Sequence, residues 1–155
     1  MKFEKDPELK HYRRVIKTGF RDEVHKILKG KNVDIDATFL GFLDIYEHLS
    51  KIIPKERTIL DFGCAYGIQA IYFLKHKKYV GIDISSCQKL KTPNSIYHKM
   101  SIKEFIKRHK DKYQNVFAIS SYVPSEEVNL IRENYSDLFI YYVSGDDLEK
   151  IKVKL

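Results

Sequence analysis

Two aspartates, each at the end of an apolar run, stand out in TILDFGCAYGIQAIYFLKHKKYVGIDIS, residues 58–85. Asp61 closes the first run, a turn of small residues from Gly63 to Gly67 follows, and Asp83 closes the second run. Free N–H groups at the start of a helix after such a turn face its occupant. The 20 residues from Gly63 to Asp83 match the spacing between a nucleotide-binding turn and its ribose-binding acid. The segment therefore predicts a site for a nucleoside-containing ligand.

The turn departs from two common nucleotide fingerprints. From Gly63 the residues read Gly-Cys-Ala-Tyr-Gly, which does not fit the Gly-x-Gly-x-x-Gly pattern of dinucleotide-binding proteins. The chain also has no Gly-Lys-Ser/Thr phosphate loop. Because the carboxylate of Asp61 would also repel a pyrophosphate, a pyrophosphate ligand is not expected in this turn.

The elements that must position these acids follow from the hydrophobic pattern. Apolar runs predict strands at 58–62, 78–83, 95–100, 115–120 and 137–143, separated by helical stretches at 66–77, 85–90, 102–112 and 125–134. This alternation predicts an α/β fold with a doubly wound, mainly parallel sheet, in which ligands bind at the carboxyl ends of the strands. The tail EKIKVKL alternates apolar and polar residues and predicts one last edge strand.

We interpret residues 1–155 as a single domain, with a helical N-terminal segment at 1–57 and the α/β core at 58–155. The composition is 43% apolar and 32% charged, and no apolar run reaches the ~20 residues of a membrane span. The charged N-terminus lacks the apolar core of a signal peptide, and only two cysteines occur. These features predict a cytoplasmic protein without a membrane partner.

The stretches ILDFGCAYG and VGIDIS resemble the first two motifs of class I S-adenosylmethionine-dependent methyltransferases, with Ala65 in place of the middle glycine. The resemblance implies a Rossmann-like fold, here short at its C-terminus, and S-adenosyl-L-methionine as cofactor. It also implies that Asp61 and the backbone from Gly63 through Ala65 to Gly67 hold the amino acid end of the cofactor. By the same resemblance, Asp83 takes the ribose hydroxyls and Ile84 packs on the adenine.

Two further loops complete the expected site. The loop after the third strand offers Ser101 and Ile102 to the adenine, and the end of the fourth strand offers Ser120 to the cofactor. Ser121 and Tyr122 are the catalytic candidates, although methyl transfer from a sulfonium can run largely on proximity and orientation. The fourth strand runs into SSYVP instead of the Asp/Asn-Pro-Pro-Tyr of amino-methylating relatives, so the methyl acceptor stays unidentified.

Two other classes of function remain open. The first is a cofactor-binding but non-catalytic regulator or partner subunit. The second is a nucleic-acid-binding module that uses residues 58–114, where 11 Lys and Arg face only four Asp and Glu. Nucleic acid is not favoured, because these lysines lack clustered arginines or interleaved aromatic residues in the sequence.

Two expectations concern ions and partners. No histidine pairs with Cys, Asp or Glu at metal-ligand spacing, so no metal site is predicted. The few residues after the fifth strand leave an exposed sheet edge. We expect that lysines keep this edge from pairing with another strand, or that it pairs with a second copy of the chain or with another partner.

Overall fold

The computed structural model describes residues 46–155 apart from 87–88, 122, 124, 145–146 and 151–155. The chain divides into two compact units, Met1–Ile52 and Ile53–Leu155. In the first unit, residues 46–52 form a helix. The helices predicted before residue 46 lie outside the described residues. Within the described part of the chain, every helix is too short or too polar to cross a membrane.

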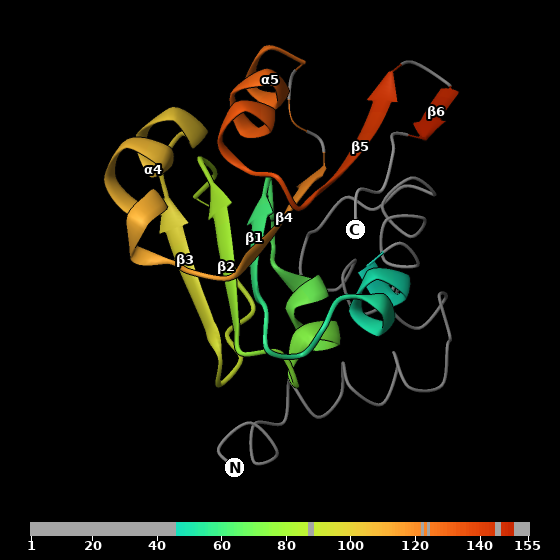
Figure 1. The fold of residues 1–155 in the computed structure, drawn as a ribbon, viewed down its shortest axis with the longest axis vertical. Helices are drawn as coiled ribbons and strands as arrows, with labels where there is room; N and C mark the ends of the chain where they lie inside the picture. Colours follow the sequence, from blue (N-terminus) through green and yellow to red (C-terminus); the bar gives the residue numbers. More distant parts are fainter. Residues whose placement is uncertain (1–45, 87–88, 122, 124, 145–146, 151–155) are drawn as a thin grey trace. The chain divides into compact units, whose positions relative to one another are not determined.

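The second unit is built on one six-stranded sheet of order β3-β2-β1-β4-β5-β6 (Figure 1). Its first five strands are parallel, and β6 pairs with β5 in antiparallel register. This topology confirms the predicted α/β fold with a mainly parallel sheet. The strands are β1 (Thr58–Phe62), β2 (Lys78–Asp83), β3 (Ser95–Lys99), β4 (Val116–Ser121), β5 (Leu138–Ser144) and β6 (Asp147–Lys150).

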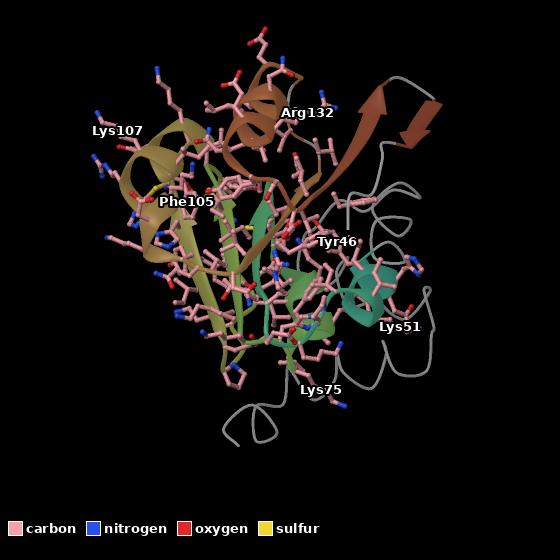
Figure 2. All side chains as sticks on the ribbon, viewed as in Figure 1. Tyr46, Lys51, Lys75, Phe105, Lys107 and Arg132 are labelled. Carbon is pink, nitrogen blue, oxygen red and sulfur yellow. The ribbon has the colours of Figure 1, made fainter. Side chains whose placement is uncertain are left out.

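Helical elements lie on both faces of the sheet. The helices α4 (Ile102–His109) and α5 (Ser125–Asn134) cover one face and share its hydrophobic core with β1, β2, β4 and β5. The short helix η2 (Ile68–Phe73) lies against the other face, where Phe73 stacks on Tyr79 of β2. On α4, Phe105 points to the sheet and is fully buried, whereas Lys107 points to solvent (Figure 2).

The strand order places a switch point between β1 and β4. The connections from β1 lead to β2 and β3 on one side, and those from β4 lead to β5 on the other. In doubly wound sheets, ligands bind in the crevice outside the carboxyl ends of the strands at such a switch point. The turn after β1 lies at the carboxyl ends of the strands beside this switch point, as the sequence predicted. We call this side of the sheet its carboxyl edge and the side where the strands begin its amino edge.

Two predicted helices are wrong in length or kind. The stretch 66–77 forms only the 3-10 helix η2, and its residues are mostly buried. Ile68, Ile71 and the aromatic side chains of η2 are poor helix formers, which favours a short buried turn over a long helix. In the stretch 85–90, the described residues are not helical, because Leu90 donates its N–H to the Tyr66 carbonyl and accepts from Tyr97.

A last edge strand is present, and it shares only residues 149 and 150 with the predicted tail. It forms as β6, which begins two residues before the predicted stretch, and the rest of the tail lies outside the described residues. The edge of β5 is therefore covered by this strand, so β3 and β6 are the outermost strands among the described residues. The short 3-10 helix η3 (Lys110–Lys112) follows α4 and leads toward β4. Association through a sheet edge stays a prediction.

Candidate functional site

The turn after β1 adopts a left-handed backbone at every second residue. The φ angles are 78° at Gly63, 48° at Ala65 and 68° at Gly67. These are the three positions at which the resembled motif carries glycine, so the structure accounts for the spacing. Ala65 adopts this conformation in spite of its Cβ atom, at a cost of about 1 kcal/mol.

Asp61 braces the turn from inside the protein. Its side chain is fully buried, and its Oδ2 atom accepts hydrogen bonds from Gln69 Nε2 at 2.7 Å and from the Tyr79 hydroxyl. Gln69 also donates to the Cys64 carbonyl at 2.9 Å, which ties the turn to the carboxylate. A direct contact between Asp61 and a ligand would require this network to open, and that predicted contact stays a prediction.

Asp83 joins the end of β2 to the same turn. Its Oδ2 atom accepts from the N–H of Ala65 at 2.9 Å, and its Oδ1 atom accepts from the N–H of Ser85 at 2.7 Å. Burial raises the pKa of Asp83, but these two bonds, the Ser85 hydroxyl and Lys89 outweigh burial and hold the pKa below its usual range. The side chain is therefore an ionised, half-buried carboxylate at neutral pH.

Ile84 is the apolar residue that directly follows Asp83 in the sequence. Its side chain is 73% exposed, which is unusual for isoleucine in a packed domain. Ser101 and Ile102, the other residues predicted to contact adenine, have different neighbours. The Ser101 hydroxyl accepts from the N–H of Glu104 at 3.2 Å and caps α4, and Ile102 is buried in the core.

The end of β4 carries the remaining predicted residues. Ser120 pairs in register with Phe62 of β1, is almost fully buried, and has no partner for its hydroxyl among the described residues. Ser121 ends the same strand, but nothing is described of its side chain, and Tyr122 lies outside the described residues. The structure thus brings the turn, Asp61 and Asp83 together and leaves the catalytic candidates as predictions.

Tyr97 on β3 is a part of this region that the sequence analysis missed. Its hydroxyl donates to the Leu90 carbonyl and lies 3.4 Å from the Gly67 carbonyl oxygen, and burial raises its pKa. The ring occupies the space beside Gly81, where an added Cβ atom would lie 2.6 Å from Tyr97 Cδ1. Gly81 was the available signal, because a glycine inside an apolar strand often marks a close approach of other atoms.

Within the part of the chain that the structure describes, no three His, Cys, Asp or Glu side chains gather in a way that could hold a metal ion. The polar groups at the carboxyl edge are carboxylates, amides and hydroxyls. Such groups bind a polar organic ligand through hydrogen bonds.

Comparisons with known proteins add little to this geometry. No protein-family profile and no curated protein sequence matches the chain. One solved structure that is similar to it comes from a protein of Anaeromyxobacter dehalogenans assigned as a type II methyltransferase, at 15% identity and a TM-score of 0.46. The match covers 65% of this chain and 48% of that one, so this chain spans about half of its length. A likeness this distant says nothing about the activity of this chain.

Proposed function

We propose that the chain binds S-adenosylmethionine at the carboxyl ends of β1, β2 and β4 and transfers its methyl group to an acceptor. The observation that carries this proposal is Asp83, an ionised carboxylate held by the N–H of Ala65 inside a left-handed turn. One side chain thereby connects the turn with the end of the second strand.

The hydrogen bonds of Asp83 are compatible with a sugar diol. A carboxylate offers about four acceptor positions. Two of these positions accept from the backbone N–H groups of Ala65 and Ser85, and a third accepts from the Ser85 hydroxyl. The Ser85 hydroxyl can rotate away. The two hydroxyls of a ribose would then donate to the acceptor position that it leaves and to the fourth position, which is still free.

The neighbouring groups suit the rest of an adenosyl ligand. The exposed Ile84 follows Asp83 directly and provides an apolar surface for the adenine ring. The alternating left-handed residues of the turn allow its backbone to approach a ligand closely. When bound, the cofactor would supply the methyl group, and the task of the chain would be to hold cofactor and acceptor in line.

Asp61 favours a second candidate, a protein that binds the cofactor without catalysis. Its carboxylate is fully buried and engaged by Gln69 and Tyr79, so the amino acid half of the cofactor would meet no free acid from this residue. A chain that recognises mainly the adenosine half would bind S-adenosylmethionine, its demethylated product and adenosine with similar affinity.

Isothermal titration calorimetry with S-adenosylmethionine tests the binding. We expect dissociation constants in the micromolar range and at least a tenfold weaker Kd for Asp83→Ala, because the acceptor of the ribose hydroxyls is removed. Ser85→Ala is the sharper variant, since it removes the competing hydroxyl and keeps the backbone N–H, so affinity should be unchanged or higher. Glu56→Gln, on an exposed carboxylate just before β1 and outside both proposed sites, is the matched control.

Absence of binding to the folded wild-type chain would overturn both candidates. If binding occurs, incubation with methyl-labelled cofactor and a cell extract separates them. Transfer of label that Asp83→Ala abolishes supports the methyltransferase. Binding without any labelled acceptor, together with equal affinity for adenosine, supports the non-catalytic candidate.

A further inference from the structure

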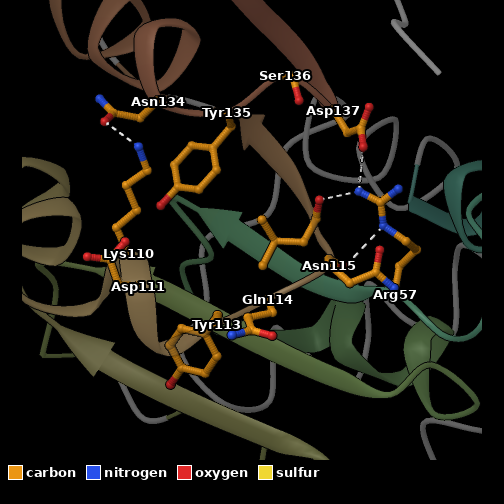
Figure 3. Close-up of a pocket in the computed structure, with 11 residues that line it drawn as sticks. Arg57, Lys110, Asp111, Tyr113, Gln114, Asn115, Asn134, Tyr135, Ser136 and Asp137 are labelled. Carbon is orange, nitrogen blue, oxygen red and sulfur yellow. Dashed lines mark hydrogen bonds and ion pairs between the residues drawn. The ribbon is translucent and has the colours of Figure 1, made fainter.

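A second pocket lies at the opposite edge of the sheet, where the strands begin. Its volume is about 550 Å³, within the range of small-ligand pockets. Arg57 precedes β1, Asn115 precedes β4 and Asp137 precedes β5, and all three line the pocket (Figure 3). Because parallel strands begin at one edge, this pocket is separate from the turn after β1.

Tyr135 contributes a polar group without a partner. The residue is only 8% exposed, and its hydroxyl has no hydrogen-bond partner among the described residues. Burial and the nearby Asp111 carboxylate raise the pKa of Tyr135 to about 12, so the hydroxyl keeps its proton at neutral pH. Figure 3 shows it directed toward the end of the pocket that Lys110 and Asp111 line. Leaving a buried hydroxyl unpaired is unfavourable, and a bound ligand that accepts from it would remove this penalty.

Arg57 forms a fixed wall of the pocket. Its Nε atom donates to the Asn115 carbonyl at 3.0 Å, and its Nη2 atom donates to the Val116 carbonyl and to Asp137 Oδ2, the latter at 2.6 Å. The ion pair neutralises Asp137. The other terminal nitrogen of Arg57 has no partner within the described part of the chain, so it can donate to a ligand.

One lysine lines the pocket, and a second lies against the ring of a tyrosine that lines it. Lys110 binds Asn134 Oδ1 at 3.1 Å, and Lys78 Nζ lies 5.8 Å from the centre of the Tyr113 ring. Neither lysine, nor the exposed Lys112, forms an ion pair with an acid among the described residues. The fold brings Tyr113 and Tyr135, which lie 22 residues apart in the sequence, into one pocket with Lys110.

We propose that this pocket and its lysines bind single-stranded nucleic acid, with one base in the pocket and the phosphates on Lys78, Lys110 and Lys112. An unstacked base needs a partly apolar cavity, which Tyr113, Tyr135 and Val116 supply. A basic surface next to such a cavity attracts the backbone.

Asp111 gives the pocket a preference among bases. It lines the pocket as an exposed carboxylate and forms no hydrogen bond or ion pair with another described residue. A carboxylate only accepts hydrogen bonds and repels phosphate, so it suits a base edge that bears an amino group. Adenine, cytosine and guanine carry exocyclic amino groups, and uracil and thymine do not. We therefore expect oligouridine and oligothymidine to bind more weakly than the other homopolymers.

Fluorescence anisotropy with labelled twelve-nucleotide RNA and DNA oligomers tests this proposal across a range of salt concentrations. The double variant Lys110→Ala/Lys112→Ala should weaken binding and reduce the slope of log K against log salt by about 1.4, or about 0.7 for each phosphate that is no longer bound. Tyr135→Phe should weaken binding about fivefold, because one hydrogen bond to the base is removed. Asp111→Ala should remove the preference for amino-bearing bases, because the side chain then offers no acceptor to them.

Arg132→Ala is the matched control, because it removes one exposed cation from α5 outside the pocket and should leave the affinity within about twofold. Three results would overturn the proposal. They are no binding at low salt, equal affinity for all homopolymers and heparin, or binding that none of the pocket variants changes. None of these results bears on binding of S-adenosylmethionine at the other edge.

Discussion

Asp61 and Asp83, at the carboxyl ends of the strands, differ from Tyr135 and Asp111, at the amino ends, in how their polar groups are paired. At the carboxyl edge, Asp61 and Asp83 both accept hydrogen bonds from the chain, and the backbone of Ala65 is tied to the second of them. At the amino edge, the Tyr135 hydroxyl is buried without a described partner, and the nearby Asp111 pairs with no described residue. Polar groups within a recognisable motif can thus serve mainly to hold a turn, while groups outside any motif stay available to a ligand.

This contrast predicts opposite effects on stability. Removing the carboxylate of Asp61 or Asp83 should destabilise the fold, because its partners lose their hydrogen bonds. Removing the Tyr135 hydroxyl should not, because no described partner depends on it. Asp61→Ala, Asp83→Asn and Tyr135→Phe measure this difference, and Gly81→Ala tests the packing beside the turn.

Asp61→Ala should have the largest effect. The change leaves Gln69 Nε2 and the Tyr79 hydroxyl buried without their acceptor. We expect a loss of about 3–5 kcal/mol in the free energy of unfolding, measured by urea denaturation. Tyr79→Phe removes only one donor and should lose less than half as much. Equal stability of Asp61→Ala and wild type would show that the buried network does not hold the turn.

Gly81→Ala should follow, with a loss of about 1–3 kcal/mol through overpacking. The added Cβ atom would lie 2.6 Å from Tyr97 Cδ1 and 2.8 Å from Cys64 Sγ. Tyr97→Phe should not rescue it, because these contacts involve the ring and the thiol.

At Gly67 the nearest atom is the Tyr97 hydroxyl, so Tyr97→Phe should partly rescue Gly67→Ala. A double-mutant cycle by thermal unfolding distinguishes the two sites.

Asp83→Asn should cost about 1–2 kcal/mol at pH 7, since the partly exposed carboxylate accepts charge-assisted bonds that solvent weakens. Its pKa is lower in the folded chain than in the unfolded chain. The stabilisation is therefore present above the unfolded pKa of about 3.9 and is lost as the pH falls through the folded pKa. Urea denaturation from pH 7 to pH 2 should show the two proteins converging at the acid end. A constant difference across this range would contradict the assignment.

Tyr135→Phe should have the smallest effect on stability and the opposite sign. The hydroxyl has no described partner, so its removal should leave stability unchanged or raise it by about 1 kcal/mol. The ring still packs on Phe62, at 5.7 Å between ring centres. Differential scanning calorimetry measures the change. A clear loss of stability would mean that the hydroxyl has a structural partner, and that Tyr135 is held in place in the same way as Asp61 and Asp83.

Much of the fold could be predicted from the sequence. The ranges 58–62 and 78–83 match β1 and β2, because both strands are near-continuous apolar runs with sharp polar ends. The strands β3, β4 and β5 differ from the predicted ranges by about one residue at their ends, where the hydrophobic signal fades. The helix predicted at 66–77 failed, since the close packing of η2 against Asp61 and Tyr79 overrides helical periodicity.

Part of the candidate site could also be predicted from the sequence, and part could not. Asp61, Asp83 and the left-handed positions of the turn lie together as their spacing indicated, because the topology fixes where strands end. The partners of Asp61 could not be read from the sequence. Gln69 and Tyr79 become donors to it only when η2 folds back on the sheet.

By itself, the sequence determined the mainly parallel sheet, the turn after its first strand and the acid after its second, because periodicity and spacing along the chain specify these features. Only the tertiary structure decided that Asp61 faces inward, that Tyr97 fills the space beside Gly81, and that a polar pocket forms where the strands begin. These features depend on side chains far apart in the sequence, and their contacts exist only once the sheet and its helices have packed.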